Sequence, residues 1–363
     1  MKVRVVPNGV DINKFKPINR KKAVEWFEGK FCELDDDLNI VYVGRFSEEK
    51  GVEYLIKSLQ YLDEGKLFLV GGGPQEIKLK KLAGRFTNRV HFLGAVGHEE
   101  IPLIHNAMDV FVLPSVSMEG FSNSMLEALA CGLPVVATPI GAAPEVINNE
   151  LGTIVNVKDS RAIAEGVNNV RDLDRKRIHV FVRSRYSFEV IADKVYTLYS
   201  EITGYPPESI GFASLFAPPY ELSGVGMQVF QLSKSLAKRC SVTIICGIGG
   251  EGDIEGVKLV RVKSLNGLIS RPLYSISGIS RIISRISIKF RDFDIIDGRN
   301  WEGGLISLAA KKRGCKAVMS LRGEGAIGES AWKRILNKFI MQRMDCVTAT
   351  DSKTAKKAEE LLT

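Results

Sequence analysis

Two acidic residues stand where an apolar segment passes through a loop into a short helical one. Glu119 lies in the Gly-containing loop, and Glu127 lies eight positions later, one turn into the helix. Ser122 or Asn123 is a natural N-cap for that helix, and Gly132 is a natural stop. The helix start offers unpaired N–H groups and a positive dipole end, flanked by carboxylates that accept hydrogen bonds from hydroxyls. A ligand that is part anion and part polyol, such as a nucleotide sugar, fits this pattern.

A second pair of candidate residues is cationic. Arg45 ends an apolar strand, and Ser47 is a good N-cap that puts Lys50 at about the third position of a helix. A cation there opposes the helix dipole by about 0.3–1 kcal/mol, so we expect an anionic group to compensate it. The hypothesis is that Arg45 and Lys50 hold a diphosphate and stabilise charge on it when a bond breaks. The alternative is a solvated surface lysine.

Short apolar segments alternate with helical ones in both halves of the chain, and a break falls near 204–207. This alternation predicts a doubly wound parallel α/β sheet in each half. No G-x-G-x-x-G follows a strand, which argues against a dinucleotide site. The expected strands are 39–45, 66–70, 90–93, 109–113, 134–137, 153–157, 210–216, 241–246, 257–262, 294–297, 316–321 and 345–349.

Composition and charge narrow the class of protein. A chain of 363 residues with 45% apolar and 25% charged residues is typical of a soluble two-domain protein, without a membrane-spanning run or a signal peptide. The six cysteines form no C-x-x-C pair and the four histidines lack ligand spacing, which indicates reduced thiols, a cytoplasmic location and no metal site.

The positive charge is confined to one half. Residues 1–204 carry 26 Lys+Arg and 27 Asp+Glu, whereas residues 205–363 carry 24 and 15, so the second half alone has a net charge of +9. We expect that half to meet an anionic partner. Nucleic acid is a poor candidate because no aromatic residues interleave with the charge.

Several short motifs cover nearly the whole first half of the chain. They are Pro7-Asn8-Gly9-Val10-Asp11, Val43-Gly44-Arg45 with Glu49-Lys50-Gly51, Val70-Gly71-Gly72-Gly73-Pro74, Pro114-Ser115 with Glu119-Gly120-Phe121, Glu127-Ala128 and Gly132-Leu133-Pro134. These motifs are specific as a set, and with them the chain resembles the retaining glycosyltransferases of GT-B fold in glycosyltransferase family 4. That resemblance implies two Rossmann-like, doubly wound domains facing a central cleft.

The resemblance implies roles for the first-half residues. Glu127 would accept hydrogen bonds from the ribose hydroxyls, and Glu119 would face the transferred sugar. The backbone of Gly120, Phe121 and Ser122 would meet sugar hydroxyls or phosphate. One alternative makes Glu119 and Glu127 a general acid/base pair, as in a glycosidase. Another pairs Glu127 with a distant Lys or Arg.

The second half matches more loosely. Gly224, in Ser223-Gly224-Val225-Gly226 before a helix, would approach the donor from the other domain. Many family members carry His on the acceptor side, but this chain has none after His179 and has Arg299 and Arg322 at strand ends. These two arginines suit an acidic or phosphorylated acceptor. The alternative is that they pair with the acidic residues Asp297, Glu302 or Glu324.

The domain order is reversed relative to the family. We expect a connecting segment at 1–18, a donor domain at 19–204 that includes a crossing helix at about 187–203, and an acceptor-side domain at 205–363. The donor domain normally comes second, so the order resembles a circular permutation in which a cut in an exposed connection is tolerated. The alternative is a fragment or a mis-joined reading frame.

Segment 275–291 has apolar residues at helical spacing and a basic stripe, so it could rest on an anionic membrane. An ordinary packed helix with a solvated edge is the alternative. The expectation is therefore a cytoplasmic hexosyltransferase, peripheral at the inner membrane face, that needs no cofactor or metal. It would move a sugar from a UDP or GDP donor to an anionic or lipid-linked acceptor. The alternatives are a sugar-nucleotide epimerase and a nucleotide-sugar-binding scaffold with a degenerate acceptor side.

Overall fold

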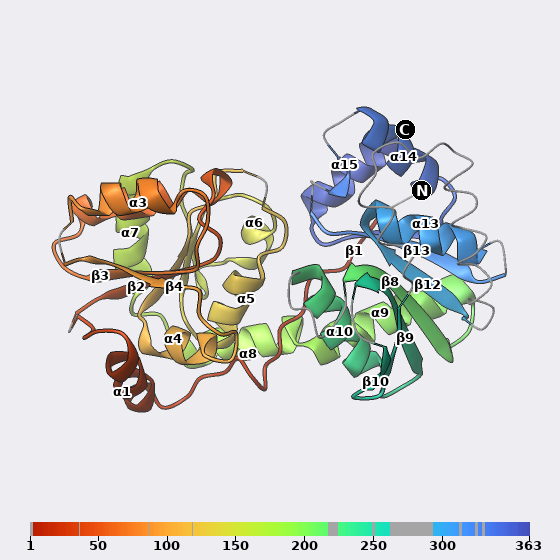
Figure 1. The fold of residues 1–363 in the computed structure, drawn as a ribbon, viewed down its shortest axis with the longest axis horizontal. Coiled ribbons are helices and arrows are strands. Elements are labelled where there is room, and N and C mark those ends of the chain that lie inside the picture. Colours follow the sequence, from red (N-terminus) through yellow and green to blue (C-terminus); the bar gives the residue numbers. More distant parts are fainter. Residues whose placement is uncertain are drawn as a thin grey trace. The chain divides into compact units, whose positions relative to one another are not determined.

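The computed structural model describes residues 3–35, 37–86, 88–117, 119–216, 224–248, 251–261, 293–311, 314–323, 326–328 and 331–363. The chain forms two compact units, Val10–Ser187 and Met1–Gly9 with Phe188–Thr363 (Figure 1). The segment 275–291 lies outside the described residues.

The Val10–Ser187 unit is built on a six-stranded sheet in the order β4-β3-β2-β5-β6-β7, and every neighbouring pair is parallel. The strands are β2 (Asn39–Val43), β3 (Lys66–Val70), β4 (Val90–Gly94), β5 (Val110–Leu113), β6 (Val135–Ala137) and β7 (Gly152–Ile154). The helices are α1 (Arg20–Lys30), α2 (Val52–Ser58), α3 (Glu76–Ala83), α4 (Ile101–Ala107), α5 (Asn123–Ala130), α6 (Ala143–Val146), α7 (Ser160–Val170) and α8 (Arg175–Tyr186), with the 3-10 turns η1 (Glu48–Lys50) and η2 (Leu59–Tyr61).

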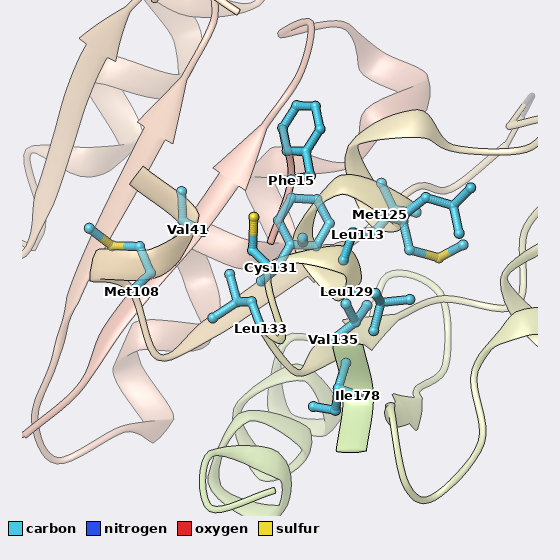
Figure 2. Close-up of a cluster of buried hydrophobic side chains, with 14 of the residues drawn as sticks. Phe15, Val41, Met108, Leu113, Met125, Leu129, Cys131, Leu133, Val135 and Ile178 are labelled. Atoms are coloured by element: carbon cyan, nitrogen blue, oxygen red, sulfur yellow. The ribbon is translucent and has the colours of Figure 1, made fainter. Parts of the chain in front are cut away.

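Both faces of this sheet are buried, as the continuous apolar strands predict. Val41 and Phe111 point into one core cluster, part of which Figure 2 shows, together with Leu129 of α5 and Ile178 of α8. Their strand neighbours point into a second cluster beneath α2 and α7. The strands of this sheet are therefore packed on both faces, and this packing positions the ends of the strands from which the loops leave.

The other unit contains an eight-stranded sheet in the order β1-β14-β13-β12-β8-β9-β11-β10. It is parallel except for β10, a short antiparallel edge strand that the sequence did not predict. Its strands are β1 (Arg4–Val5), β8 (Ser209–Phe216), β9 (Ser241–Ile248), β10 (Gly252–Ile254), β11 (Val257–Arg261), β12 (Ile295–Arg299), β13 (Lys316–Leu321) and β14 (Cys346–Ala349). Its helices are α9 (Phe188–Thr203), α10 (Gly224–Leu236), α13 (Asn300–Lys311), α14 (Ala331–Met341) and α15 (Ser352–Leu362).

The predicted fold class, two parallel-sheet α/β domains, is confirmed. The boundary between the two compact units falls after Ser187, at the start of α9, the helix that was expected to cross between the domains. The reason is that α9 buries Ile191 and Tyr199 against Ile210 and Phe212 of the other unit's core. Within the described residues, no helix is long and apolar enough to cross a bilayer.

Candidate active site

The site begins at the point where the strand order of the Val10–Ser187 sheet reverses direction. From β2 the chain builds outward through β3 and β4 on one side, and later through β5, β6 and β7 on the other. Ligands of open α/β sheets bind outside the carboxyl ends of the strands at such a switch point. The loops that follow β2 and β5 leave the sheet there side by side, because these two strands pair directly.

These two loops are held against each other by backbone contacts. The N–H of Val116 donates to the carbonyl of Glu49 at 2.8 Å. Gly51 has φ of 62°, and a Cβ added there would lie 2.2 Å from the carbonyl oxygen of Pro114. Only glycine combines this left-handed conformation with such a close approach. Gly51 therefore allows the loop after β2 to pack closely against the loop after β5.

Two of the predicted catalytic residues form an ion pair across the loops. Lys50 Nζ lies 2.6 Å from Glu119 Oε2, which also accepts a hydrogen bond from Ser115 Oγ at 2.8 Å. The side chains of Lys50 and Glu119 are 23% and 10% exposed, so the pair is largely desolvated. Behind it, Tyr42 is buried and donates to the carbonyl of Arg45 at 2.9 Å. Burial raises the pKa of Tyr42, and the nearby Glu119 raises it further.

Lys50 is the third residue of a helical turn whose N-cap is Ser47, as the sequence predicted, but that turn is not part of an α-helix. It ends the short 3-10 turn η1, and the left-handed Gly51 separates it from α2. Ser47 makes no side-chain cap bond to the backbone; its hydroxyl donates to Glu49 Oε1 at 2.6 Å. That hydrogen bond lowers the pKa of Glu49, with smaller contributions from Lys50 and Arg45. Among the described residues, the anionic group that pairs with the Lys50 ammonium is the carboxylate of Glu119.

Arg45 follows β2 and is exposed. Its side chain has no hydrogen bond or ion pair with any described residue of the chain. It lies close enough to Glu49 to affect the pKa of that carboxyl, so it shares the loop region with Lys50. Among the described residues, Lys50 therefore has a charged partner and the side chain of Arg45 has none.

Helix α5 begins after one of the two N-cap residues that the sequence predicted. Ser122 is the N-cap, and its Oγ accepts from the N–H of Met125 at 3.3 Å. The carbonyl of Gly120 accepts from the N–H of Ala142 at 3.0 Å, which fixes the loop before the helix. Phe121 is 9% exposed and packs into the core, with its ring centroid 6.0 Å from that of Tyr186. Its side chain is thus an anchor, and its backbone is the part that can face a ligand.

Glu127 has a partner that the sequence did not suggest. His98, in the loop after β4, places Nε2 3.0 Å from Glu127 Oε1, while Lys14 Nζ lies 2.9 Å from its Nδ1. An ammonium can only donate, so Nδ1 must accept and Nε2–H must donate to the carboxylate. The ring of Phe15 lies 5.3 Å from the imidazole and limits its position. His98 therefore orients Glu127, and neither predicted alternative for Glu127, a general acid/base role or a Lys/Arg partner, describes this contact.

In the other unit, the two candidate arginines differ in their surroundings. Arg299 is buried, and its Nη2 lies 3.2 Å from Asp297 Oδ2, so it forms the ion pair that was the predicted alternative. Its Cζ lies 5.0 Å from the centroid of the Phe212 ring. Arg322 is half-buried and donates from Nη1 to Asn8 Oδ1 at 2.8 Å. Arg322 is thus the member of the pair that a ligand can reach more readily.

Gly224, the remaining predicted residue, is the first residue of α10 in that unit. The residues that lead into it, 217–223, lie outside the described part of the chain. Its contact with a donor stays a prediction.

Comparison with known protein families finds a match within each unit. Residues 37–172 match the family model described as "Glycosyl transferases group 1", and residues 222–362 match "Glycosyltransferase Family 4". Both units match glycosyltransferase families. The first match contains Arg45, Lys50, Glu119 and Glu127, and the second contains Gly224, Arg299 and Arg322. The predicted class of protein is therefore confirmed at the level of the two glycosyltransferase domains.

Individual relatives align over part of the chain only. A GDP-mannose-dependent alpha-(1-6)-phosphatidylinositol monomannoside mannosyltransferase of Mycobacterium tuberculosis is 32% identical over 185 residues, 47% of each chain. An uncharacterised glycosyltransferase of Methanocaldococcus jannaschii is 32% identical over 211 residues, 54% of each chain. The solved sucrose-phosphate synthase of Thermosynechococcus elongatus is 29% identical, with a TM-score of 0.48 over 55% of this chain and 53% of that one. This chain spans about half the length of the curated relatives it matches.

Proposed function

We propose that this protein transfers a hexose from a nucleoside diphosphate sugar, of UDP or GDP type, to an acceptor hydroxyl with retention of configuration. The observation that carries the proposal is the set of charges at the switch point. Lys50, Glu119 and the unpartnered Arg45 leave the carboxyl ends of β2 and β5 together. A diphosphate suits the cations, and the hydroxyls of a sugar suit the carboxylate.

Each of the site residues binds a different part of the donor. Arg45 and Lys50 hold the diphosphate and stabilise the charge that develops on it, so no metal ion is needed for that task. Glu119 contacts the transferred sugar, and Glu127, oriented by His98, accepts hydrogen bonds from the ribose. The acceptor oxygen forms a bond to the anomeric carbon, the bond from that carbon to the phosphate breaks, and the leaving phosphate takes the acceptor's proton. This route needs no histidine on the acceptor side.

An anionic or lipid-linked acceptor is proposed from two observations. Relatives include a phosphatidylinositol monomannoside mannosyltransferase and a capsular polysaccharide biosynthesis glycosyltransferase from Staphylococcus aureus. In addition, Arg322 is half-buried and its Nε lacks a hydrogen bond among the described residues. With a lipid-linked acceptor, the transfer reaction would take place at the cytoplasmic face of the membrane.

The order of the two domains is proposed to be a circular permutation. β1 extends the parallel run of β12, β13 and β14 although it comes first in sequence, with Arg4 opposite Thr348 and Val5 opposite Ala349. The N–H of Val3 donates to Glu359 Oε1 of α15 at 2.8 Å. β14, α15 and β1 thus have the arrangement of one β-α-β unit. A changed order also accounts for alignments that stop at about half of each relative although both units match.

The alternatives are separated by what happens to the donor. A transferase releases nucleoside diphosphate slowly from its donor even without an acceptor. An epimerase alters the sugar and leaves the nucleotide attached, and a scaffold binds without changing either. The test is incubation with a panel of UDP and GDP sugars, scored for released nucleoside diphosphate, with the anomeric configuration of any transfer product read by NMR. Inversion at the anomeric carbon would contradict the retaining mechanism.

A further inference from the structure

Helix α14 has one face that is fully committed to the core of its unit. Ile340 and Met341 are 0% exposed and pack in the cluster around Met319. Asn337, also 0% exposed, donates from Nδ2 to the carbonyl of Ile327 at 2.9 Å. These contacts fix the rotation of the helix about its axis, so the opposite face must point away from the core.

That opposite face carries two large apolar side chains. Ile335 is 71% exposed and Phe339 is 46% exposed. Residues four apart lie one above the other on a helix, so the two form a single apolar ridge. Single exposed apolar residues are ordinary on protein surfaces, whereas these two adjoin on a helix whose core-facing side is already formed.

Cations flank the ridge. Arg334 and Lys338 lie along one edge of it, and Arg343 follows the end of the helix, with its guanidinium 3.8 Å from the centroid of the Phe339 ring. Residues 331–341 contain no Asp or Glu. Arg334, Lys338 and Arg343 form no ion pair with any residue that the structure describes. The α14 face, defined as Arg334, Ile335, Lys338, Phe339 and Arg343, is therefore apolar at its centre and positive at its edges.

We propose that the α14 face docks on an anionic lipid bilayer. Ile335 and Phe339 would enter the boundary between headgroups and acyl chains, while the three cations would meet lipid phosphates. Charge complementarity favours this occupant, since the half of the chain that contains α14 carries the whole net positive charge. A second copy of the chain is disfavoured because a two-fold contact would bring the same cations against one another. Self-association of the chain through this face is the competing outcome of the test below.

The test uses the full chain and sedimentation with vesicles. Phosphatidylcholine vesicles with about one third phosphatidylglycerol are compared with pure phosphatidylcholine. We expect strong binding to the anionic vesicles that is lost at high salt. The variant I335S/F339S should lower the partition coefficient at least about 10-fold. The variant R334Q/K338Q should lower it on anionic vesicles by roughly fivefold for each cation removed.

Tyr61→Ser is the matched control. Tyr61 is 48% exposed in the other unit and is followed by the acidic residues Asp63 and Glu64, so its loss should leave binding unchanged. All of these positions are exposed or half-buried, and unchanged thermal unfolding will show that the variants fold. The proposal is overturned if I335S/F339S sediments like the wild type, or if the wild type binds neutral and anionic vesicles equally. It is also overturned if the substitutions change only the mass measured by light scattering, which would make the face a protein interface.

Discussion

Lys50 Nζ and Glu119 Oε2 lie 2.6 Å apart although 69 positions separate the two residues in sequence. We propose that Lys50 binds the diphosphate of the donor and that Glu119 binds its sugar. Without a donor, the two side chains bind each other. A bound diphosphate must compete with Glu119 for Lys50, and Glu119 becomes available to the sugar as that competition succeeds. The pair therefore couples the two ends of the donor.

Glu119→Gln should tighten the binding of free nucleoside diphosphate and lower the kcat of the transfer reaction. Without the negative charge Lys50 is free for phosphate, so we expect the Kd of UDP or GDP to fall by about three- to tenfold. The lost contact to the sugar should lower kcat by about 100-fold. Isothermal titration with the nucleotide and a turnover assay measure the two effects. Weaker nucleotide binding by the variant would show that Glu119 does not compete for Lys50.

His98→Ala should raise the donor KM because the carboxylate of Glu127 loses the group that orients it. A hydrogen bond to a charged group contributes about 1.5–3 kcal/mol, so removing Glu127 itself should raise the KM by about 10- to 100-fold, and removing His98 by less. Glu99→Ala is the control: its side chain pairs with Lys14 but is 85% exposed and has no contact with Glu127. If His98→Ala leaves the KM unchanged while Glu127→Ala raises it, His98 has no positioning role.

Much of the fold can be predicted because its strands are apolar runs bounded by turn residues. β3 and β13 have the bounds that the sequence predicted, 66–70 and 316–321. β10 could not be found this way, because Gly252, Asp253 and Ile254 form neither an apolar run nor an alternating one. The amphipathic pattern of α9 predicts a buried face, but periodicity alone does not say which of the two cores will receive it.

The site was predictable in its residues more than in its contacts. Lys50 and Glu119 stand in motifs, but their pairing depends on the direct pairing of β2 with β5, which periodicity does not show. The helical turn that holds Lys50 is shorter than the sequence indicated, because the left-handed Gly51 separates it from α2. His98 was missed because its partners, Lys14 and Glu127, come from distant segments. Local spacing carried no signal for it.

Asp297→Ala should destabilise the Phe188–Thr363 unit strongly. Asp297 accepts hydrogen bonds from Tyr199 Oη at 2.6 Å and Ser320 Oγ at 2.9 Å in addition to its ion pair with Arg299. Removing it leaves the buried Arg299 uncompensated, at a cost of about 3–5 kcal/mol in the free energy of unfolding. Urea unfolding measures the change. Glu165→Ala, which breaks an exposed pair with Arg161, should have no measurable effect, and an equally small effect at Asp297 would mean that the buried pair is unimportant for stability.

His105 should make the protein sensitive to acid. Burial, with a smaller contribution from Arg175, lowers the pKa of His105 to about 3, and neither ring nitrogen has a partner among the described residues. In the unfolded chain the imidazole binds its proton near pH 6.5. The contribution of His105 to the free energy of unfolding is thus fully present above pH 6.5, and it is lost as the pH falls from 6.5 toward 3. It amounts to about 2 kcal/mol between pH 7 and 5.

Unfolding free energies measured across this pH range test the assignment to His105. His105→Leu should flatten the slope between pH 7 and 5, whatever its effect on stability at pH 7. His179→Ala is the control, since His179 is half-buried and bonded to the carbonyl of Ala130. A slope that His105→Leu leaves unchanged would place the acid sensitivity elsewhere in the chain.

The release of nucleoside diphosphate from a nucleotide sugar tests the central claim most directly. The wild type, incubated with a panel of UDP and GDP sugars, should release UDP or GDP from at least one of them without added metal. Lys50→Ala should lower that rate by about 100- to 1000-fold, while Lys57→Ala, which alters a partly exposed pair with Glu53, should not. A folded wild type that releases no nucleotide from any donor, or a Lys50→Ala variant that releases it at the wild-type rate, would contradict the account.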